Sequence, residues 1–337
     1  MPASTFHRCA VASGLVTHDD VERATAAVRA ASSDSSQPVG DDQLAVQLIA
    51  MGRLNSWQVT QLRAGRRSFT LGPYRIIDSL GKGTMGDVYM AEHSVMGRIV
   101  AIKVLSKRQS SPAAIAQFTT EIRVQAQLDH KNLVRAYDAG AERNVHFLVM
   151  EYVPGTTLRR RVRRQGKLVM ETAAAFLAQA ADGLAFAHRR GLTHRDVKPT
   201  NLLVTPEGQV KLSDMGLAGF FGDAPSDSGT RRRSSARWAD YLAPEQIAHP
   251  GTFSAAADVY ALGCTLYYAV TGKVPFPAET AEEKTAGHLH SLPIHPRLLN
   301  AELSDEFVDL IGEMMAKDPR ERTASADEVS RRLRELA

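Results

Sequence analysis

The chain has 337 residues, of which 44% are hydrophobic and 23% are charged. This composition suits a folded globular protein with room for about two domains, and it excludes a largely disordered chain or a membrane-embedded bundle. Forty-one Lys and Arg residues against 37 Asp and Glu give a net charge of +4, which is too small to indicate a nucleic-acid-binding protein but would suit phosphate-bearing ligands if the charges cluster.

Residues 1–70 are predicted to form a small helical module. A weak repeat relates Gly14 to Gly52, and in each copy a capping residue, Thr17 or Asn55, follows three positions later. Such side chains accept hydrogen bonds from the free N–H groups of a first helical turn, so two helix-turn-helix units are expected to pack on one another. Their expected core contains Leu44, Leu48, Trp57 and Leu62. A structural appendage and a partner-binding module are both open as roles.

The N-terminal residues and the cysteines indicate the compartment. The first twenty residues lack the basic start and apolar stretch of a secretion signal, and no run reaches the about 18 apolar residues of a membrane span. The two cysteines, Cys9 and Cys264, are too few for a disulfide framework or a thiolate metal site. We therefore expect a cytoplasmic protein with no membrane span.

Short β-rich segments begin at Tyr74 and are separated by Gly-containing turns, which indicates an antiparallel meander. One helix is expected over 112–128, and after Gly155 the sequence becomes mainly helical. The pattern predicts an α+β fold with a small β-rich lobe at 74–151 and a larger α-helical lobe at 155–337. A ligand crevice is expected at their junction.

The segment GKGTMG at 81–86 has the Gly-x-Gly-x-x-Gly spacing, which lets a backbone approach phosphates closely because no Cβ intervenes. In a dinucleotide-binding fold a helix would open directly after it, whereas Val88 and Tyr89 continue as strand. The segment also lacks the Gly-Lys-Ser/Thr ending of a Walker loop. A hairpin lid over phosphates is therefore expected, although a plain glycine turn is open on this motif alone.

Lys103 lies in the strand VAIKV, where it shares a face with Ala101 and points toward whatever Ala101 and Val88 enclose. Glu121 falls on the apolar stripe of the following helix, three residues after Phe118, and is expected to point inward. An inward carboxylate would hold Lys103 extended toward phosphate oxygens. For Lys103 considered alone, a solvated surface position is open.

The segment HRDVKPTNLL at 194–203 places Asp196, Lys198 and Asn201 within six residues, and Asp214 follows thirteen residues after Asn201. Phosphoryl transfer needs a carboxylate to orient the attacking hydroxyl, a cation for the migrating group and oxygen ligands for magnesium. This constellation contains all of them.

With these motifs in order and Ala243-Pro244-Glu245 after them, residues 74–337 resemble the eukaryotic-like, Hanks-type serine/threonine protein kinases of bacteria. The resemblance implies transfer of the ATP γ-phosphate to protein Ser or Thr hydroxyls, with Mg²⁺ as cofactor, autophosphorylation, and regulation by phosphorylation of the activation loop. By the family pattern, Lys198 two residues after Asp196 favours Ser/Thr over Tyr acceptors.

The resemblance also assigns roles to matching positions. The implied catalytic set is Asp196 as base, Lys198 at the γ-phosphate, Asn201 and Asp214 as magnesium ligands, and Lys103, held by Glu121, at the α and β phosphates. The implied nucleotide-binding set is Leu80, Gly81, Lys82, Gly83, Thr84, Met85, Gly86, Asp87, Val88, Ala101, Lys103, Glu151, Val153 and Leu203, with Met150 as gatekeeper. Asp258 resembles the anchor of the catalytic-loop backbone, and Glu245 with Arg322 a buried ion pair.

The activation loop carries several candidate phosphate acceptors, and Arg195 before the base suggests that a phosphate orders this loop. The candidates are Ser226, Ser228, Thr230, Ser234 and Ser235.

Five arginines at 159–164 could recruit acidic substrates or hold phosphate, but a solvated helical face is the preferred interpretation. Nucleic-acid binding is not expected because no recognised motif accompanies them.

The chain departs from the family pattern at three places. Met215 stands where Phe is usual, Gln125 occupies a place that is usually apolar, and Arg237-Trp238 replace a Gly-Thr. Gln125 and Trp238 motivate one alternative, a pseudokinase scaffold whose module at 1–70 recruits partners. A small-molecule phosphotransferase is a second alternative, which the long activation segment disfavours.

Overall fold

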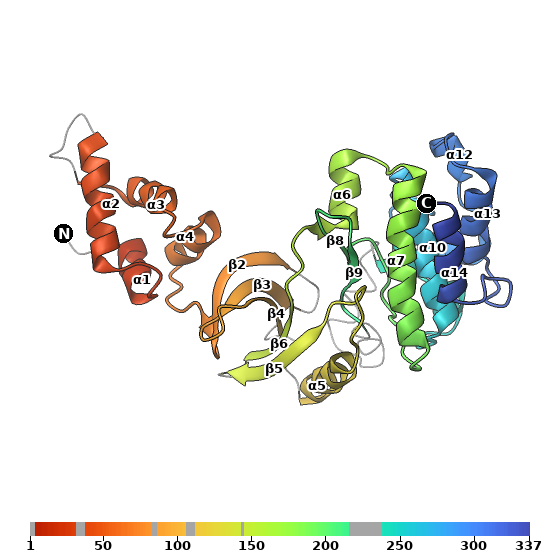
Figure 1. Ribbon diagram of the computed structural model, residues 1–337, viewed down its shortest axis with the longest axis horizontal. Helices are drawn as coiled ribbons and strands as arrows, with labels where there is room; N and C mark the ends of the chain where they lie inside the picture. The colour runs from red at the N-terminus through yellow and green to blue at the C-terminus, as the bar shows by residue number, and fades with distance from the viewer. Residues whose placement is uncertain (1–3, 32–37, 83–85, 106–111, 143–144, 216–237) are drawn as a thin grey trace. The chain divides into compact units, whose positions relative to one another are not determined.

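The computed structural model describes residues 4–31, 38–82, 86–105, 112–142, 145–215 and 238–337 (Figure 1). The chain forms two compact units. The first contains residues 1–112 and 137–152, and the second contains residues 113–136 and 153–337.

The N-terminal module is helical, as predicted. Its four helices are α1 (Thr5–Ala12), α2 (His18–Ala31), α3 (Asp41–Ala50) and α4 (Ser56–Arg63). Before α2, the Thr17 hydroxyl accepts from the Asp20 N–H while the Asp20 carboxylate accepts from the Thr17 N–H. Asn55 and Gln58 make the same reciprocal cap before α4. These matching capping boxes confirm the internal repeat.

The module has a hydrophobic core of its own. α1 packs against α4 and α2 against α3, and the predicted residues Leu44, Leu48 and Leu62 are buried between them. Arg53, in the second repeat, pairs with Asp20 of the first at 2.9 Å. Trp57 was predicted for the core, but it is only half-buried, because it packs against this core and that of the following sheet.

A six-stranded sheet with the order β1-β2-β3-β4-β6-β5 completes the first unit. Its strands are β1 (Thr70–Leu71), β2 (Tyr74–Lys82), β3 (Gly86–His93), β4 (Ile99–Leu105), β5 (Ala136–Glu142) and β6 (Val145–Glu151). The pairs from β1 to β4 and from β4 to β6 are antiparallel, which confirms the meander. Sequence pattern did not predict β1, which has two residues, or β5, which has no β-branched residue.

The module and the sheet are packed against each other within this unit. The Asn55 side-chain amide donates to the Ile77 carbonyl at 3.0 Å. The Trp57 ring lies 5.8 Å from the ring of Phe69 and 5.8 Å from that of Tyr89. The Arg66 guanidinium lies over all three rings at 5.2–5.7 Å. The module is therefore a packed extension of the sheet.

The second unit is mainly helical, and Figure 1 shows its helices α7, α10 and α14 side by side. Its elements are α5 (Pro112–Ala126), β7 (Thr156–Thr157), α6 (Leu158–Gln165), α7 (Met170–His188), β8 (Leu202–Val204), β9 (Val210–Leu212), η2 (Trp238–Tyr241), α9 (Pro244–Ala248), α10 (Ala255–Thr271), α11 (Ala281–His290), α12 (Pro296–Leu299), α13 (Asp305–Met314) and α14 (Ala326–Glu335). A β-rich unit and a helical unit after a helical module confirm the predicted α+β fold.

α10 is a fully buried helix over most of its length, since every residue from Ala257 to Thr271 is buried. Gly263 is required there because a Cβ at this position would lie 2.8 Å from the Met314 Cβ on α13. Among the helices in the described part of the chain, none combines the length and apolar character that crossing a bilayer requires.

Candidate active site

Asp258 anchors the backbone of the loop that follows α7. Its buried carboxylate at the start of α10 accepts from the N–H groups of His194 and Arg195, at 2.8 and 2.9 Å. His188 Nε2 lies 2.8 Å from the same carboxylate. A buried carboxylate is tolerated when its oxygens are satisfied in this way, and the contacts confirm the anchoring role predicted for Asp258.

Two residues of the site adopt left-handed backbone conformations that side chains other than glycine seldom take. The φ angle is 69° at Arg195 and 63° at Asp214. Such conformations cost about 1–3 kcal/mol each and persist where surrounding contacts impose them. At Arg195, the Asp258 carboxylate holds the N–H and the guanidinium lies 4.5 Å over the Phe253 ring.

Asp196, Lys198 and Asn201 converge on one carboxylate. Lys198 Nζ donates to both oxygens of Asp196, at 2.8 and 2.6 Å. Asn201 Nδ2 donates to the Asp196 carbonyl at 2.8 Å and to its Oδ2 at 3.1 Å. The Asp196 and Lys198 side chains keep 22% and 30% of their surface exposed, so a substrate can reach the carboxylate.

Asp214 is tied to the same loop through Ser213. The Ser213 N–H donates to the Asn201 carbonyl at 2.9 Å, and the Ser213 hydroxyl lies 3.4 Å from Asp214 Oδ2. His194, which is fully buried, has its Nε2 2.9 Å from the Ser213 carbonyl. His194 therefore supports the loop from a buried position through its contact with the Ser213 backbone.

Asn201 and Asp214 carry the kinds of oxygen atom that a magnesium ion binds. Both hydrogen bonds recorded for the Asn201 amide nitrogen go to Asp196, which leaves Asn201 Oδ1 as an acceptor, 3.4 Å from the Thr200 hydroxyl. Asp214 contributes a carboxylate, which is linked to Asn201 through the contacts that Ser213 makes with both residues. Amide and carboxylate oxygens are the ligands that Mg²⁺ prefers.

In the first unit, strand register places the predicted nucleotide-binding residues on one face of the sheet. Val88 pairs with Lys103, and Ala101 pairs with Met150. Because directly paired residues share a face and side chains alternate along a strand, these four point to the same side. Tyr89 follows Val88 on β3 and therefore points to the opposite side of the sheet, where the module packs.

Several of the other positions predicted to bind nucleotide lie outside the described residues. Gly83, Thr84 and Met85 lie outside the described residues, as do the side chains of Lys82 and Glu121, so the predicted pairing of Glu121 with Lys103 has no structural account here. Lys103 itself is buried, and Leu203 on β8 is half-buried. Positions 80 and 81 are exposed at the end of β2.

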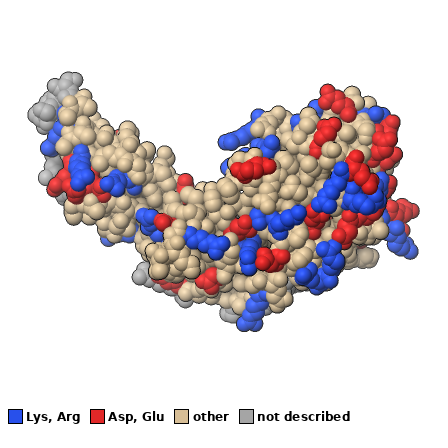
Figure 2. All heavy atoms as spheres, in the orientation of Figure 1, with Lys and Arg blue, Asp and Glu red and all other residues tan. Residues whose placement is uncertain are grey.

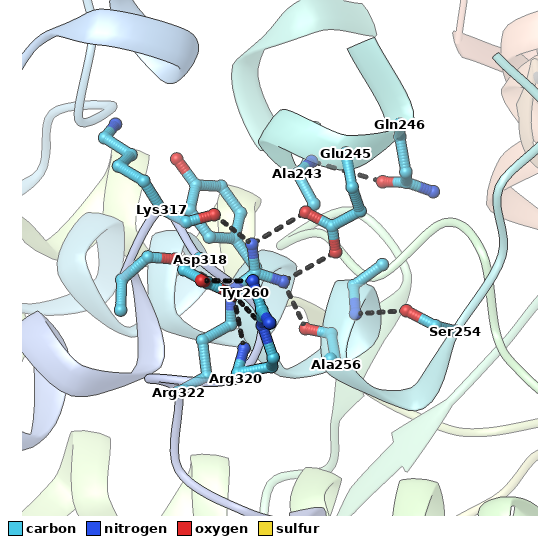
Figure 3. A network of polar contacts seen from close by, with 12 residues as sticks. Ala243, Glu245, Gln246, Ser254, Ala256, Tyr260, Lys317, Asp318, Arg320 and Arg322 are labelled. Atoms are coloured by element: carbon cyan, nitrogen blue, oxygen red, sulfur yellow. Dashed lines mark hydrogen bonds and ion pairs between the residues drawn. The ribbon is translucent and has the colours of Figure 1, made fainter. Parts of the chain in front are cut away.

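Arg322 forms the predicted ion pair with Glu245 (Figure 3). Two parallel hydrogen bonds of 2.6 and 2.7 Å join the guanidinium to the carboxylate, and the guanidinium side chain has no exposed surface. It also donates to the carbonyls of Ala256, Ala316 and Lys317 and lies 4.8 Å over the Tyr260 ring. The structure confirms this prediction.

Sequence reasoning missed a second buried pair, which joins the segment before Ala243 to α11. Lys284 on α11 donates to Asp240 in η2, and both side chains are buried. Beside them, Tyr260 OH lies 2.8 Å from His288 Nδ1, and burial, aided by the charge of Lys317, lowers the pKa of His288 to about 3. No sequence signal links Asp240 to Lys284, because they are 44 residues apart.

The three departures from the family pattern have different outcomes. Met215 is buried in the core of the second unit, as expected of an apolar substitute. Gln125 is also buried; its Nε2 lies 3.5 Å from the Val134 carbonyl, and its Oε1 has no partner among the described residues. Arg237 and the Trp238 side chain lie outside the described residues, as do the candidate phosphate acceptors at 226–235.

Comparison with known proteins gives a consistent result. The family profile described as the protein kinase domain matches residues 74–332. The chain is 34% identical over 259 residues to the serine/threonine-protein kinase PrkC of Bacillus subtilis, covering 77% of this chain and 39% of that protein. It is 34% identical over 261 residues to PknB of Mycobacterium tuberculosis, covering 76% and 41%. A probable serine/threonine-protein kinase of Clostridium perfringens is 35% identical over 260 residues, covering 76% and 37%. The chain thus spans about two-fifths of the length of these relatives.

Proposed function

Because this chain belongs to the protein kinase family, we propose that it is a serine/threonine kinase that transfers the γ-phosphate of ATP to hydroxyl groups of proteins. The observation that carries the proposal is the group of Asp196, Lys198 and Asn201, tied to Asp214 through Ser213. It supplies a partly exposed carboxylate, a cation and two oxygen ligands within one short network.

Each side chain has a defined task in this reaction. Asp196 orients the acceptor hydroxyl and takes its proton as the oxygen attacks the γ-phosphorus. Lys198 compensates negative charge on the phosphoryl group while the bond to the β-phosphate oxygen breaks and ADP is released. Asn201 and Asp214 would hold Mg²⁺, which when bound supplies further charge neutralisation at the phosphate oxygens. Lys103 would bind the α and β phosphates.

A transfer assay tests this proposal. The full chain is incubated with magnesium and γ-labelled ATP, alone and with Ser/Thr-rich proteins, beside an Asp196→Asn variant. We expect wild type to label itself and the added proteins, and the variant to lose about 10²–10⁴-fold in rate while still binding nucleotide. If both bind nucleotide and transfer equally little, the pseudokinase scaffold is the correct interpretation.

For the module at 1–70, we propose that it binds a partner and that the effect of this binding is transmitted to the nucleotide site through the sheet. The supporting observation is its contact with Tyr89 on β3, whose hydroxyl lies 3.1 Å from Asp87 beside the glycine-rich loop. The boundary between this module and a kinase domain at 74–337 stays a prediction.

We also propose that the activation loop is phosphorylated. In addition, we propose a cytoplasmic location, which suits two cysteines that are both free and buried.

A further inference from the structure

The charges of helix α6 are arranged in a way that destabilises the helix. Its sequence LRRRVRRQ contains five arginines and no acidic residue. Positive charge in the first turn opposes the helix dipole, and like charges four residues apart repel each other. The helix is held by the Thr157 cap and by burial of Leu158 and Val162. An arrangement that costs helix stability calls for an explanation outside the helix.

The arginines of α6 have no acidic partner in the described part of the chain. None of the recorded ion pairs among those residues includes an arginine of 159–164, whereas Arg331, Arg332 and Arg334 on α14 each pair with a carboxylate. Figure 2 shows Lys and Arg side chains gathered over α6. This surface therefore presents positive charge that the described residues do not compensate, as an anion-binding surface does.

The position of α6 beside the catalytic loop is fixed. The Arg159 N–H donates to the Pro199 carbonyl at 2.9 Å, three residues after the proposed base. At 100° per residue, Arg159 and Arg163 form a stripe that flanks the buried side of the helix, while Arg160 and Arg164 point away from it.

The charges of Arg159 and Arg163 act on two tyrosines of the second unit. Burial raises the pKa of Tyr241 and of Tyr268, and positive charge opposes this effect, from Arg159 at Tyr241 and from both arginines at Tyr268. Tyr241 lines the same small hollow as Asp196 and Lys198. Because the Arg159 backbone is bonded to Pro199 in the same loop as Asp196, a protein segment that places its hydroxyl at Asp196 would pass close to the stripe.

We propose that Arg159 and Arg163 select protein substrates that carry acidic or phosphorylated side chains next to the acceptor hydroxyl. This inference rests on the kinase activity proposed above. Guanidinium groups bind carboxylates and phosphates through paired N–H donors, so both kinds of anion fit the same stripe.

The test uses the full chain and peptides with one Ser acceptor, in which Asp, phosphoserine or Asn is placed at successive flanking positions. KM and kcat are measured for wild type, for the double variant R159Q/R163Q and for R160Q/R164Q, the matched control on the same helix. We expect an anionic peptide to have a KM about three- to tenfold below that of its Asn counterpart. This ratio falls toward one in R159Q/R163Q and in high salt, and it persists in R160Q/R164Q.

The possible outcomes separate the inference from the proposed function. Transfer to all peptides with no preference for anionic ones, or an equal loss of preference in both double variants, overturns the role of the stripe but leaves the kinase. Absence of transfer to any peptide overturns the inference, and if the protein also labels neither itself nor Ser/Thr-rich proteins, it overturns the kinase activity as well. RNA binding that R159Q/R163Q abolishes, with the peptide KM ratio unchanged, would assign the stripe to nucleic acid and overturn the inference.

Discussion

At the scale of single residues, the second unit depends on buried charges that are each fully partnered. Asp258 is satisfied by two backbone N–H groups, and Arg322 by Glu245 and three carbonyls. The sequence predicted both, because the kinase motifs specify them. It could not predict the pair of Asp240 and Lys284, which depends on how two segments pack.

Removing one partner of the Glu245–Arg322 pair should be strongly destabilising. In Arg322→Met, the Glu245 carboxylate loses its two hydrogen bonds, and we expect a loss of about 3–5 kcal/mol in the free energy of unfolding. Urea denaturation measures this loss. The matched control is Arg331→Met on α14, whose pairs with Glu328 and Glu335 are largely exposed, and it should change stability little. Equal effects of the two variants would contradict the importance of burial.

His288 should make the stability of the protein depend on pH. Its pKa is about 3 in the folded protein and near 6.5 when unfolded, so only the unfolded chain binds a proton between these values. The contribution of neutral His288 to the free energy of unfolding is therefore fully present above about pH 6.5. It falls as the pH is lowered toward 3, by up to about 1.4 kcal/mol per pH unit.

Urea midpoints at pH 7 and pH 5 test this dependence in wild type and in His288→Asn, which keeps an acceptor for the Tyr260 hydroxyl. The groups that face the His288 ring are Tyr260, Phe276, Lys284, Lys317 and the backbone at Asp240. Wild type should lose more stability on acidification than the variant. The same loss in both would show that His288 is not the group responsible.

At the scale of elements, strand alternation explains how one sheet serves two purposes. Lys103 and Val88 lie on the face predicted to bind nucleotide, while Tyr89 and Ile102 are directed to the other face. Periodicity predicted the strands and this nucleotide face. It did not predict that the module would pack on the opposite face, because the contact of Trp57 with Tyr89 on β3 joins residues that are 32 positions apart in sequence.

Substitution of Trp57 should loosen the module from the sheet. In Trp57→Ala, two ring contacts and part of the shared apolar core are lost, and we expect a cost of about 2–4 kcal/mol. Hydrogen exchange should become faster at the amides of β3. Val46→Ala on α3, where the side chain is 68% exposed, is the control and should leave exchange in β3 unchanged. Unaltered exchange in Trp57→Ala would show that the module does not support β3.

At the scale of the whole molecule, the residues proposed for the reaction are divided between the two compact units. Lys103 belongs to the first unit, and Asp196, Asn201 and Asp214 belong to the second. Motif order alone predicted which residues lie in each unit, since each motif has a fixed place in a kinase sequence. The role of residues 1–70 could not be read in the same way, because they lie outside the matched family region.

Nucleotide should stabilise the full chain only when Lys103 and Asp214 are both present. For wild type with Mg·ATP at about 100 times its Kd, we expect a stabilisation of about 2.7 kcal/mol, seen as a higher Tm in a thermal scan. Lys103→Met and Asp214→Asn should each lose most of this increase. Asp309→Asn, on α13 and outside the proposed site, should keep it. An unchanged increase in either site variant would remove that residue from the nucleotide site.

The most direct test of the central claim is an experimental structure of the full chain with Mg²⁺ and a non-hydrolysable ATP analogue. We predict that Asn201 Oδ1 and the Asp214 carboxylate bind the metal at about 2.0–2.1 Å, with Lys103 Nζ at hydrogen-bonding distance from the α or β phosphate. A triphosphate bound elsewhere, with these three side chains making no contact to metal or nucleotide, would contradict the account.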